Sequence, residues 1–423
     1  MPADSRLRWH TIATLTVALV LLAACTQNPN SVFHSRTEFN RDVSSLFKLL
    51  IILGTIVFVF TEVMLLIALV KFRSKPGQPR QPEQTHGNTK LEILWTVIPA
   101  VVLAIIAVPT VQTIFKTQGE ARADALEIEV IGHQWWWEFK YPQYNITTAN
   151  EVYLPLGRTV SFTLNTHDVI HSFWIPGLGG KRDLVYNEGS KWLAHRHNKI
   201  WMTPDSTTED AFNGFCAEYC GTSHANMRFR AFTVTPENFA SWVAHQQQPQ
   251  ANPMAPAPAT NTKTATKTAG RTPTQPAVPA PVQAGFVGYD RTKMPAYAWP
   301  QTPIPASLTY DTTLVGDPVR GAMTVAGGTC TLCHTIAGVP TMVGTTGPNL
   351  THVGSRLTIG GGLFPNDTRH LAAWIKNARV MKPGVFMTTQ GKGQYDPIAK
   401  TVLNIGLTDQ QIADVVAYLQ SLK

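Results

Sequence analysis

One short loop of the sequence gathers four groups that bind soft metals. It holds Cys216, Cys220, His224 and Met227. Thiolate and thioether sulfurs suit Cu(I) and imidazole nitrogen also tolerates the oxidised ion, so this set is typical of copper in an electron-transfer site. Two cysteines exceed the need of a mononuclear blue copper site, and they permit two coppers bridged by both sulfurs. That arrangement requires a second imidazole, which His171 offers at the end of a predicted strand.

The same two cysteines allow a simpler interpretation, which is a disulfide in an oxidising compartment. Two cysteines four positions apart would favour a disulfide if they stood alone. The histidine and methionine at metal-binding offsets, with His171 in its own segment, favour copper instead. Other histidines fall outside this pattern and are interpreted as surface or supporting residues: His167, His195 and His197.

A second redox motif, C-x-x-C-H, follows later in the chain. Cys330 and Cys333 supply thiols for thioether bonds to a haem, and His334 supplies the proximal iron ligand. Methionine is the expected distal ligand of a high-potential carrier, and the near candidates are Met381 and Met387. Chance and zinc binding are alternatives for so short a motif, but neither explains the helical segment with an available methionine that follows it.

The composition indicates a membrane protein. The chain has 423 residues, of which 44% are hydrophobic and only 15% charged, so some apolar residues are expected to face lipid. Apolar runs at residues 46–70 and 93–115 are each long enough to cross a bilayer, and each predicts a transmembrane helix. The segment between them is rich in Lys and Arg, which places it in the cytoplasm and the later domains outside. The net charge of +8 forms no dense basic patch, so no nucleic-acid partner is expected.

The N-terminus has the pattern of an export signal. Arg6 and Arg8 precede an apolar stretch that is too short to span a bilayer, so residues 1–24 are predicted to be a signal peptide. The stretch ends in Leu-Ala-Ala-Cys at Cys25, which resembles the lipobox of bacterial lipoproteins, where the cysteine is lipidated. An ordinary cleaved signal is the alternative. Bacteria attach haem covalently outside the cytoplasmic membrane, so we expect an inner-membrane protein with its redox domains on the periplasmic side.

The segment after the membrane hairpin alternates apolar and polar residues. Leu126, Ile128 and Val130 show this period of two, which predicts strands with one buried face. We expect a β-barrel or sandwich over residues 120–245, closed by a short helix that Thr235 caps.

The remainder of the chain divides into a linker and a helical domain. Residues 246–284 are rich in Pro, Ala and Thr and cannot bury enough apolar surface to fold, so they are predicted to be a linker. Residues 310–423 are predicted to form a small all-α domain, with helix caps at Asp317 and Thr408.

The copper loop and the segment Asp168-Val169-Ile170-His171-Ser172-Phe173-Trp174 resemble the cupredoxin-like dinuclear copper (Cu A) domain of subunit II of haem-copper oxidases. The resemblance extends from the helical hairpin to about His245. In that family the Glu218 position supplies a backbone carbonyl to copper, and its side chain helps bind magnesium at the boundary with subunit I. The resemblance implies these copper ligands: His171, Cys216, Glu218, Cys220, His224 and Met227.

This chain departs from that family after the first copper histidine. The family pattern is K-x-D-x-x-P-G-R-x-N, and here Lys181 and Asp183 match, but the next match begins at Arg196 after an insertion. The Pro-Gly pair is absent from the sequence, so a reshaped loop near the magnesium site and the donor docking surface is expected.

The last domain resembles class I cytochromes c. Residues 382–387 read K-P-G-V-F-M, which matches the K-P-G-x-x-M element of that family, and Gly347-Pro348-Asn349-Leu350 matches the segment that packs beside the haem. The resemblance therefore implies covalently bound haem c with Met387 as the distal ligand.

Together these resemblances imply the subunit II of a cytochrome c oxidase with a fused cytochrome c. Electrons would pass from a soluble or membrane-bound donor such as cytochrome c to the haem, then to copper, then to haem in subunit I, where oxygen is reduced with proton pumping. One alternative is the same subunit of a related nitric oxide reductase. Another is a membrane-anchored carrier without a catalytic partner, which the second membrane helix disfavours because one anchor would suffice.

Three further residues have expected roles. By resemblance, Trp135 lies above the copper as the electron input residue, with simple packing as its alternative. Glu92 occupies the position of a proton-uptake channel mouth leading into subunit I, and its alternative is a charge that complements the helix dipole. Glu62 lies inside the first membrane helix, where a carboxylate should face protein rather than lipid.

Overall fold

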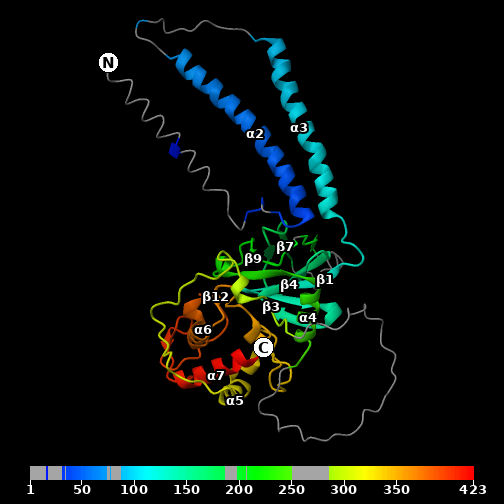
Figure 1. Cartoon of the computed structure of the whole chain (residues 1–423). Helices are drawn as coiled ribbons and strands as arrows, with labels where there is room; N and C mark the ends of the chain where they lie inside the picture. Colours follow the sequence, from blue (N-terminus) through cyan, green and yellow to red (C-terminus); the bar gives the residue numbers. More distant parts are fainter. Residues whose placement is uncertain are drawn as a thin grey trace.

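The structure is a computed structural model that describes residues 16–17, 31–33, 35–73, 77, 87–185, 198–205, 207–249 and 285–423. Figure 1 shows a pair of long helices standing on a sheet domain, with a smaller helical domain packed against the side of the sheets. Most of the predicted signal peptide, Cys25, most of the predicted linker and most of the insertion after Asp183 lie outside the described residues.

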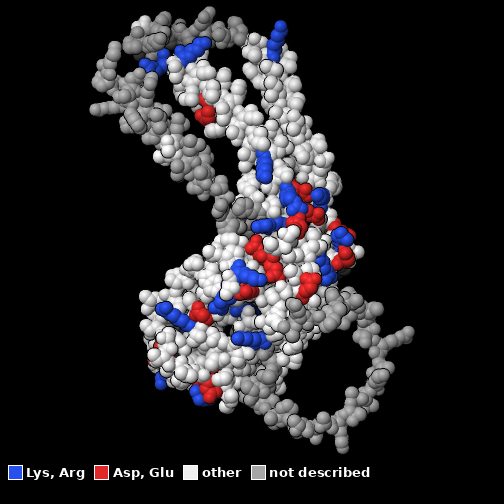
Figure 2. Space-filling view, in the orientation of Figure 1, with Lys and Arg blue, Asp and Glu red and all other residues white. Residues whose placement is uncertain are grey.

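The two long helices are α2 (Glu38–Lys71) and α3 (Thr89–Gln118), and both are long and apolar enough to cross a membrane. They contain the predicted segments and extend beyond them. The extension of α2 has a packing reason, because its first turn is buried on the sheet domain: Thr37 caps the helix and donates to the Leu178 carbonyl, and Asn40 donates to the Pro176 carbonyl. Figure 2 shows Lys and Arg at the end of the hairpin far from the sheets and a gathering of charged residues where the hairpin meets the sheets, with a mostly uncharged surface between them.

The sheet domain is a sandwich of two five-stranded sheets, with strand orders β3-β2-β1-β5-β8 and β4-β10-β9-β6-β7. This arrangement confirms the predicted cupredoxin-like class. The strands have these bounds: β1 (Leu126–His133), β2 (Trp136–Tyr141), β3 (Ile146–Ala149), β4 (Glu151–Pro155), β5 (Val160–Thr166), β6 (His171–Trp174), β7 (Arg182–Leu184), β8 (Asn198–Met202), β9 (Asp210–Cys216) and β10 (Arg228–Val234).

The core of the sandwich follows the predicted alternation. Leu126, Ile128 and Val130 of β1 are all fully buried, because successive residues of a strand point to opposite faces. Helix α4 (Pro236–Gln246) closes one end of the sandwich, and the Thr235 side chain accepts a hydrogen bond from its first turn as predicted. Trp242 of this helix stacks on Tyr153 with ring centroids 4.7 Å apart, which fixes the helix to the sheet.

The helical domain contains α5 (Pro318–Gly327), α6 (Thr368–Met381) and α7 (Asp409–Ser421). Asp317 caps α5, and Thr408 with Gln411 forms the predicted capping box on α7. The domain also has two short ladders that the all-α prediction did not include, and short 3₁₀ turns: β11 (Thr358–Ile359), β12 (Phe364–Pro365), β13 (Tyr395–Asp396), β14 (Thr401–Val402), η4 (Thr329–Leu332) and η5 (Val353–Ser355).

The segment before the helical domain packs on the sandwich. Tyr289, Met294 and Ala298 are buried in the core of the sheet domain. Tyr289 stacks on Phe232 with centroids 4.8 Å apart, and its backbone N–H donates to the Tyr153 hydroxyl. The chain is thus fastened to the sheets immediately before the helical domain begins.

Candidate copper and haem sites

The sheet topology brings the predicted copper ligands together. His171 begins β6 and Cys216 ends β9, and these strands are antiparallel neighbours with Phe173 opposite Cys216. The loop after β9 returns through a short 3₁₀ turn, η2 (His224–Asn226), and continues as β10. A histidine and a loop that lie far apart in the sequence therefore meet at one end of the second sheet.

The distances within this cluster suit metal binding. The two thiol sulfurs, Cys216 Sγ and Cys220 Sγ, lie 3.7 Å apart. Cys216 Sγ lies 3.8 Å from His171 Nδ1 and 3.2 Å from the Glu218 carbonyl oxygen. Cys220 Sγ lies 3.6 Å from Nδ1 of His224 and 3.8 Å from Sδ of Met227. All six predicted ligand residues thus lie in one cluster.

The cluster is protected from solvent, and its sulfurs are free thiols. His171 and Met227 are fully buried, and Cys220 is nearly so. The sulfur separation exceeds the roughly 2 Å of a disulfide bond. The Cys220 thiol and the His171 imidazole lower the pKa of Cys216. A thiol with a lowered pKa releases its proton more easily, which a thiolate ligand of a metal must do.

A carboxylate orients the first imidazole. Asp168 Oδ1 lies 2.8 Å from His171 Nε2, so that nitrogen is engaged and Nδ1 faces the sulfurs. Asp168 Oδ2 accepts a hydrogen bond of 2.7 Å from the Gln134 backbone N–H. A carboxylate that bonds to the ring nitrogen facing away from the metal fixes the ring orientation of a metal-binding histidine. A role for Asp168 was not predicted, although its position three residues before a predicted copper ligand could have indicated a partner for His171.

Trp135 lies directly against the copper loop. Its indole Nε1 donates to the Cys220 carbonyl at 2.9 Å, and only 7% of the residue is exposed. The helical domain supplies its cover. Phe386 stacks parallel to the indole with ring centroids 6.3 Å apart, and a side chain at Gly384 would collide with the ring. Trp135 therefore lies between the copper cluster and the loop that holds Met387.

The C-x-x-C-H motif is built around a tight turn. Cys330 lies in η4, and His334 donates from Nδ1 to the Pro348 carbonyl at 2.8 Å, which leaves Nε2 available to a metal. A side chain at Gly347 would meet the imidazole at 2.7 Å, so this position needs a glycine. Burial lowers the pKa of His334, which favours the neutral imidazole that binds iron. Cys333 is exposed beside it.

The two candidate distal methionines have different surroundings. Met381 ends α6 and is packed in the apolar core of the helical domain. Met387 lies half-buried on the loop beyond α6, next to Phe386. A core methionine is already used in packing, so these surroundings favour Met387 as the ligand.

Three carboxylates with predicted roles toward partner protein are exposed in this chain. Glu92 lies in the first turn of α3, and Glu62 lies in the middle of α2. The side chain of Glu218 is exposed beside the copper cluster while its carbonyl faces inward. All three side chains are open to a partner subunit.

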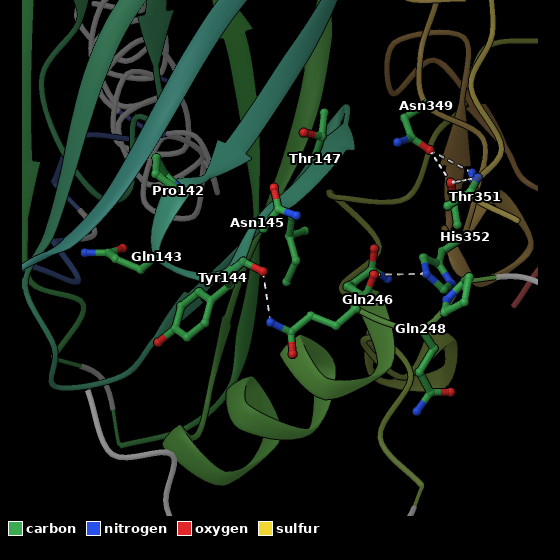
Figure 3. Close-up of a pocket in the computed structure, with 14 residues that line it drawn as sticks. Pro142, Gln143, Tyr144, Asn145, Thr147, Gln246, Gln248, Asn349, Thr351 and His352 are labelled. Atoms are coloured by element: carbon green, nitrogen blue, oxygen red, sulfur yellow. Dashed lines mark hydrogen bonds between the residues drawn. The ribbon is translucent and has the colours of Figure 1, made fainter. Parts of the chain in front are cut away.

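A polar cavity of about 600 Å³ lies between the sheet domain, the end of α4 and the helical domain (Figure 3). Gln246 lines it from the end of α4, and its carbonyl lies 3.2 Å from Nε2 of His352 in the helical domain. Asn349 and Thr351 line the same side and bond to each other. Its lining mixes amide, hydroxyl and imidazole groups with apolar side chains such as Ile146 and Ala337. The hydrogen bond between His352 and Gln246 joins the two domains beside it.

The sequence matches three family models in chain order. "Cytochrome C oxidase subunit II, transmembrane domain" matches residues 30–113, "Cytochrome C oxidase subunit II, periplasmic domain" matches residues 145–233, and "Cytochrome c" matches residues 319–423. The first two models imply a membrane-anchored oxidase subunit with a copper centre, and the third implies a haem.

Two relatives cover most of the chain. Cytochrome c oxidase subunit 2 of Alkalihalophilus pseudofirmus is 30% identical over 378 residues, which are 88% of this chain and 85% of that protein. The protein of the same name from Bacillus sp. strain PS3 is 30% identical over 367 residues, 83% and 80% of the two chains. Among solved structures, the periplasmic domain of subunit II of cytochrome oxidase from Bradyrhizobium japonicum is 27% identical, with a TM-score of 0.27 over 30% of this chain and 97% of that one.

Proposed function

Because this chain belongs to the cytochrome c oxidase subunit II family, we propose that it carries electrons from its own haem c, through a dinuclear copper centre, to subunit I of a haem-copper oxidase. The observation that carries this route is the position of Trp135, which contacts the copper loop on one side and the Met387 loop on the other. These two contacts support an electron path between the two redox motifs.

The copper pair would be held by the side chains of the clustered ligands and by the Glu218 carbonyl. Bound there, it supplies a one-electron carrier whose charge is shared between two ions. The chain's own part is to keep the site dry and to hold the ligands still. Asp168 fixes the His171 ring, and burial excludes water from the sulfurs. The exposed Glu218 side chain is proposed to meet magnesium at the boundary with subunit I.

The haem would be attached through Cys330 and Cys333 and ligated by His334 and Met387. Bound there, it supplies the reducible iron that receives the electron from the donor. The Pro348 carbonyl fixes the His334 tautomer. From the methionine loop, the route passes through Phe386 to the indole and then along its hydrogen bond to the copper ligand Cys220, with a cytochrome c or similar donor outside.

The proposed membrane placement rests on the charge of the hairpin loop. Lys and Arg between the helices favour a cytoplasmic loop in the bacterial inner membrane, with the redox domains on the periplasmic side. Glu92 then lies at the cytoplasmic end of α3, where it is proposed to feed protons into subunit I. Lipidation at Cys25 would add a second anchor, and mass spectrometry of the mature N-terminus decides it: a mature chain that does not begin at a lipid-modified Cys25 contradicts it.

The route is tested in the purified oxidase without oxygen. A photochemical reductant delivers one electron to the haem, and haem and copper absorbance are followed together. The expected result is haem oxidation at the same rate as copper reduction. Copper reduction that precedes or bypasses the haem would contradict the route. Oxygen turnover by the same preparation, with subunit I co-purifying, separates an oxidase from a nitric oxide reductase or a free carrier.

A further inference from the structure

The contact between the copper and haem domains closes around a buried lysine. Lys382 is 1% exposed, and its Nζ donates to the Trp135 carbonyl at 2.6 Å and to the Gly360 carbonyl at 3.0 Å. The first bond crosses from the haem domain to the copper domain. The next residue adds a second crossing bond, because Ser223 Oγ donates to the Pro383 carbonyl at 2.5 Å. The start of the K-P-G-x-x-M element is thus bonded to the copper side.

A buried ammonium is costly, and the two hydrogen bonds of the Lys382 ammonium go to backbone carbonyls. Burying such a group without a carboxylate costs free energy that a methionine of similar size would not. Burial accordingly lowers the pKa of Lys382 to about 7. Residues that break the rules of core packing concentrate at sites where function requires them. The energetic cost therefore indicates a role for Lys382 at Trp135.

The neighbouring backbone is shaped to admit the lysine. Gly360, Gly361 and Gly362 all have positive φ angles, which glycine adopts without strain. A side chain at Gly361 would lie 2.7 Å from Lys382 Nζ and 3.2 Å from the Trp135 carbonyl oxygen. The Gly361 carbonyl accepts from the Arg228 N–H at the end of the copper loop. The glycines let the haem domain approach the copper loop closely enough for Nζ to reach it.

We propose that Lys382 is a positioning residue that locks the haem domain onto Trp135, so that the haem delivers electrons to copper from a fixed dock and not by diffusion of a tethered domain. The proposal rests on the proposed haem-to-copper route and adds how the two centres are held. It gives Lys382 a role distinct from haem ligation. The lock holds Phe386 over the indole, because Phe386 belongs to the loop that Lys382 begins.

The test uses the complete purified oxidase with Lys382→Met, which keeps the apolar stem and removes the donors. The matched control is Lys392→Met, an exposed lysine of the same domain. Haem-to-copper transfer is measured after a photochemical pulse at several solvent viscosities. A locked domain transfers at a rate independent of viscosity. In Lys382→Met the docked fraction falls, so transfer slows by about tenfold or more and becomes viscosity-dependent, while the haem potential and both spectra match the control.

A second pair of variants keeps the test sharp if Lys382→Met does not assemble. Gly361→Ala pushes into Nζ and is expected to show the same slow, viscosity-dependent transfer. Gly393→Ala is its control, because Gly393 has a similar positive φ of 75° with no atom near its missing side chain. No haem-to-copper transfer in the parent overturns the proposed route and the lock with it. Transfer that is equally fast and viscosity-independent in the parent and in the assembled variants overturns the lock alone.

Discussion

A buried carboxylate at the contact between the two domains gives a quantitative prediction. Glu151 begins β4 and is 2% exposed. Its Oε1 accepts from the Leu357 N–H at 2.9 Å, the Thr358 N–H at 2.8 Å and the Thr358 hydroxyl at 2.9 Å, all of the haem domain. Glu151→Ala leaves these donors buried without an acceptor. The docked state should weaken by roughly 3–5 kcal/mol, which is a 10²–10³-fold or larger increase in opening.

The charge of this carboxylate has a separate effect. Burial raises the pKa of Glu151 from 4.5 to about 6. The docked state therefore binds the proton more tightly than the open state. Docking is strongest below pH 4.5, weakens as the pH rises to about 6, and is level above that, with a total change of about 2 kcal/mol. Glu151→Gln keeps an acceptor oxygen and removes this pH dependence.

Amide hydrogen exchange at Leu357 and Thr358 in the purified oxidase measures the opening directly. After correction for intrinsic exchange rates, the parent should lose protection between pH 4.5 and 6, the glutamine variant of Glu151 should be level across that range, and the alanine variant should exchange fastest. Amides of α7 serve as an internal control, because the hydrogen bonds of Glu151 go to Leu357 and Thr358 and not to that helix. Equal exchange in parent and alanine variants would refute the assigned role, and a rise in protection toward pH 6 would refute the sign.

The remaining predictions concern the redox and proton sites. Metal analysis should find two coppers per chain, and Cys216→Ser or Cys220→Ser should abolish electron transfer to subunit I; one copper, zinc, or retained turnover contradicts the dinuclear site. Met387→His should lower the haem potential and remove the methionine-to-iron absorption band, whereas Met381→Leu should leave both unchanged; the opposite pattern exchanges their roles. Glu92→Gln should slow oxygen turnover while haem and copper spectra stay intact, and parental turnover across pH would leave Glu92 as a helix-end charge.

The elements and motifs could be predicted because their signals are local. The caps at Thr235 and Thr408 precede their helices directly, and the strand alternation at Leu126 repeats every second residue. Copper binding by the loop could be predicted from the types of its side chains and from their spacing. Only His171 comes from a distant strand, and it was found because a copper pair requires a second imidazole and because its segment matches the family pattern.

The docking of the haem domain was not predicted because its signals are distant and were assigned to other roles. Lys382 reads as part of a haem motif, and its partner Trp135 lies 247 positions earlier in the chain. Glu151 begins a strand in which every residue is buried, which periodicity alone cannot distinguish from an ordinary core strand. The run of three glycines before Leu363 was the best available signal, since positive φ in succession predicts a close backbone approach.

The polar character of this contact follows from the covalent connection between the domains. Two domains of one chain already meet at a high effective concentration, so little further affinity is needed to hold them together. Orientation is the remaining requirement. Buried hydrogen-bonded charges such as Glu151 and Lys382 contribute little net stability, but they disfavour any other orientation of the two domains that would leave these charges unpaired. An apolar contact of the same size would tolerate sliding and would separate Phe386 from Trp135. The contact therefore selects one orientation of the haem loop on the copper loop, and electron transfer between fixed centres requires such a single orientation.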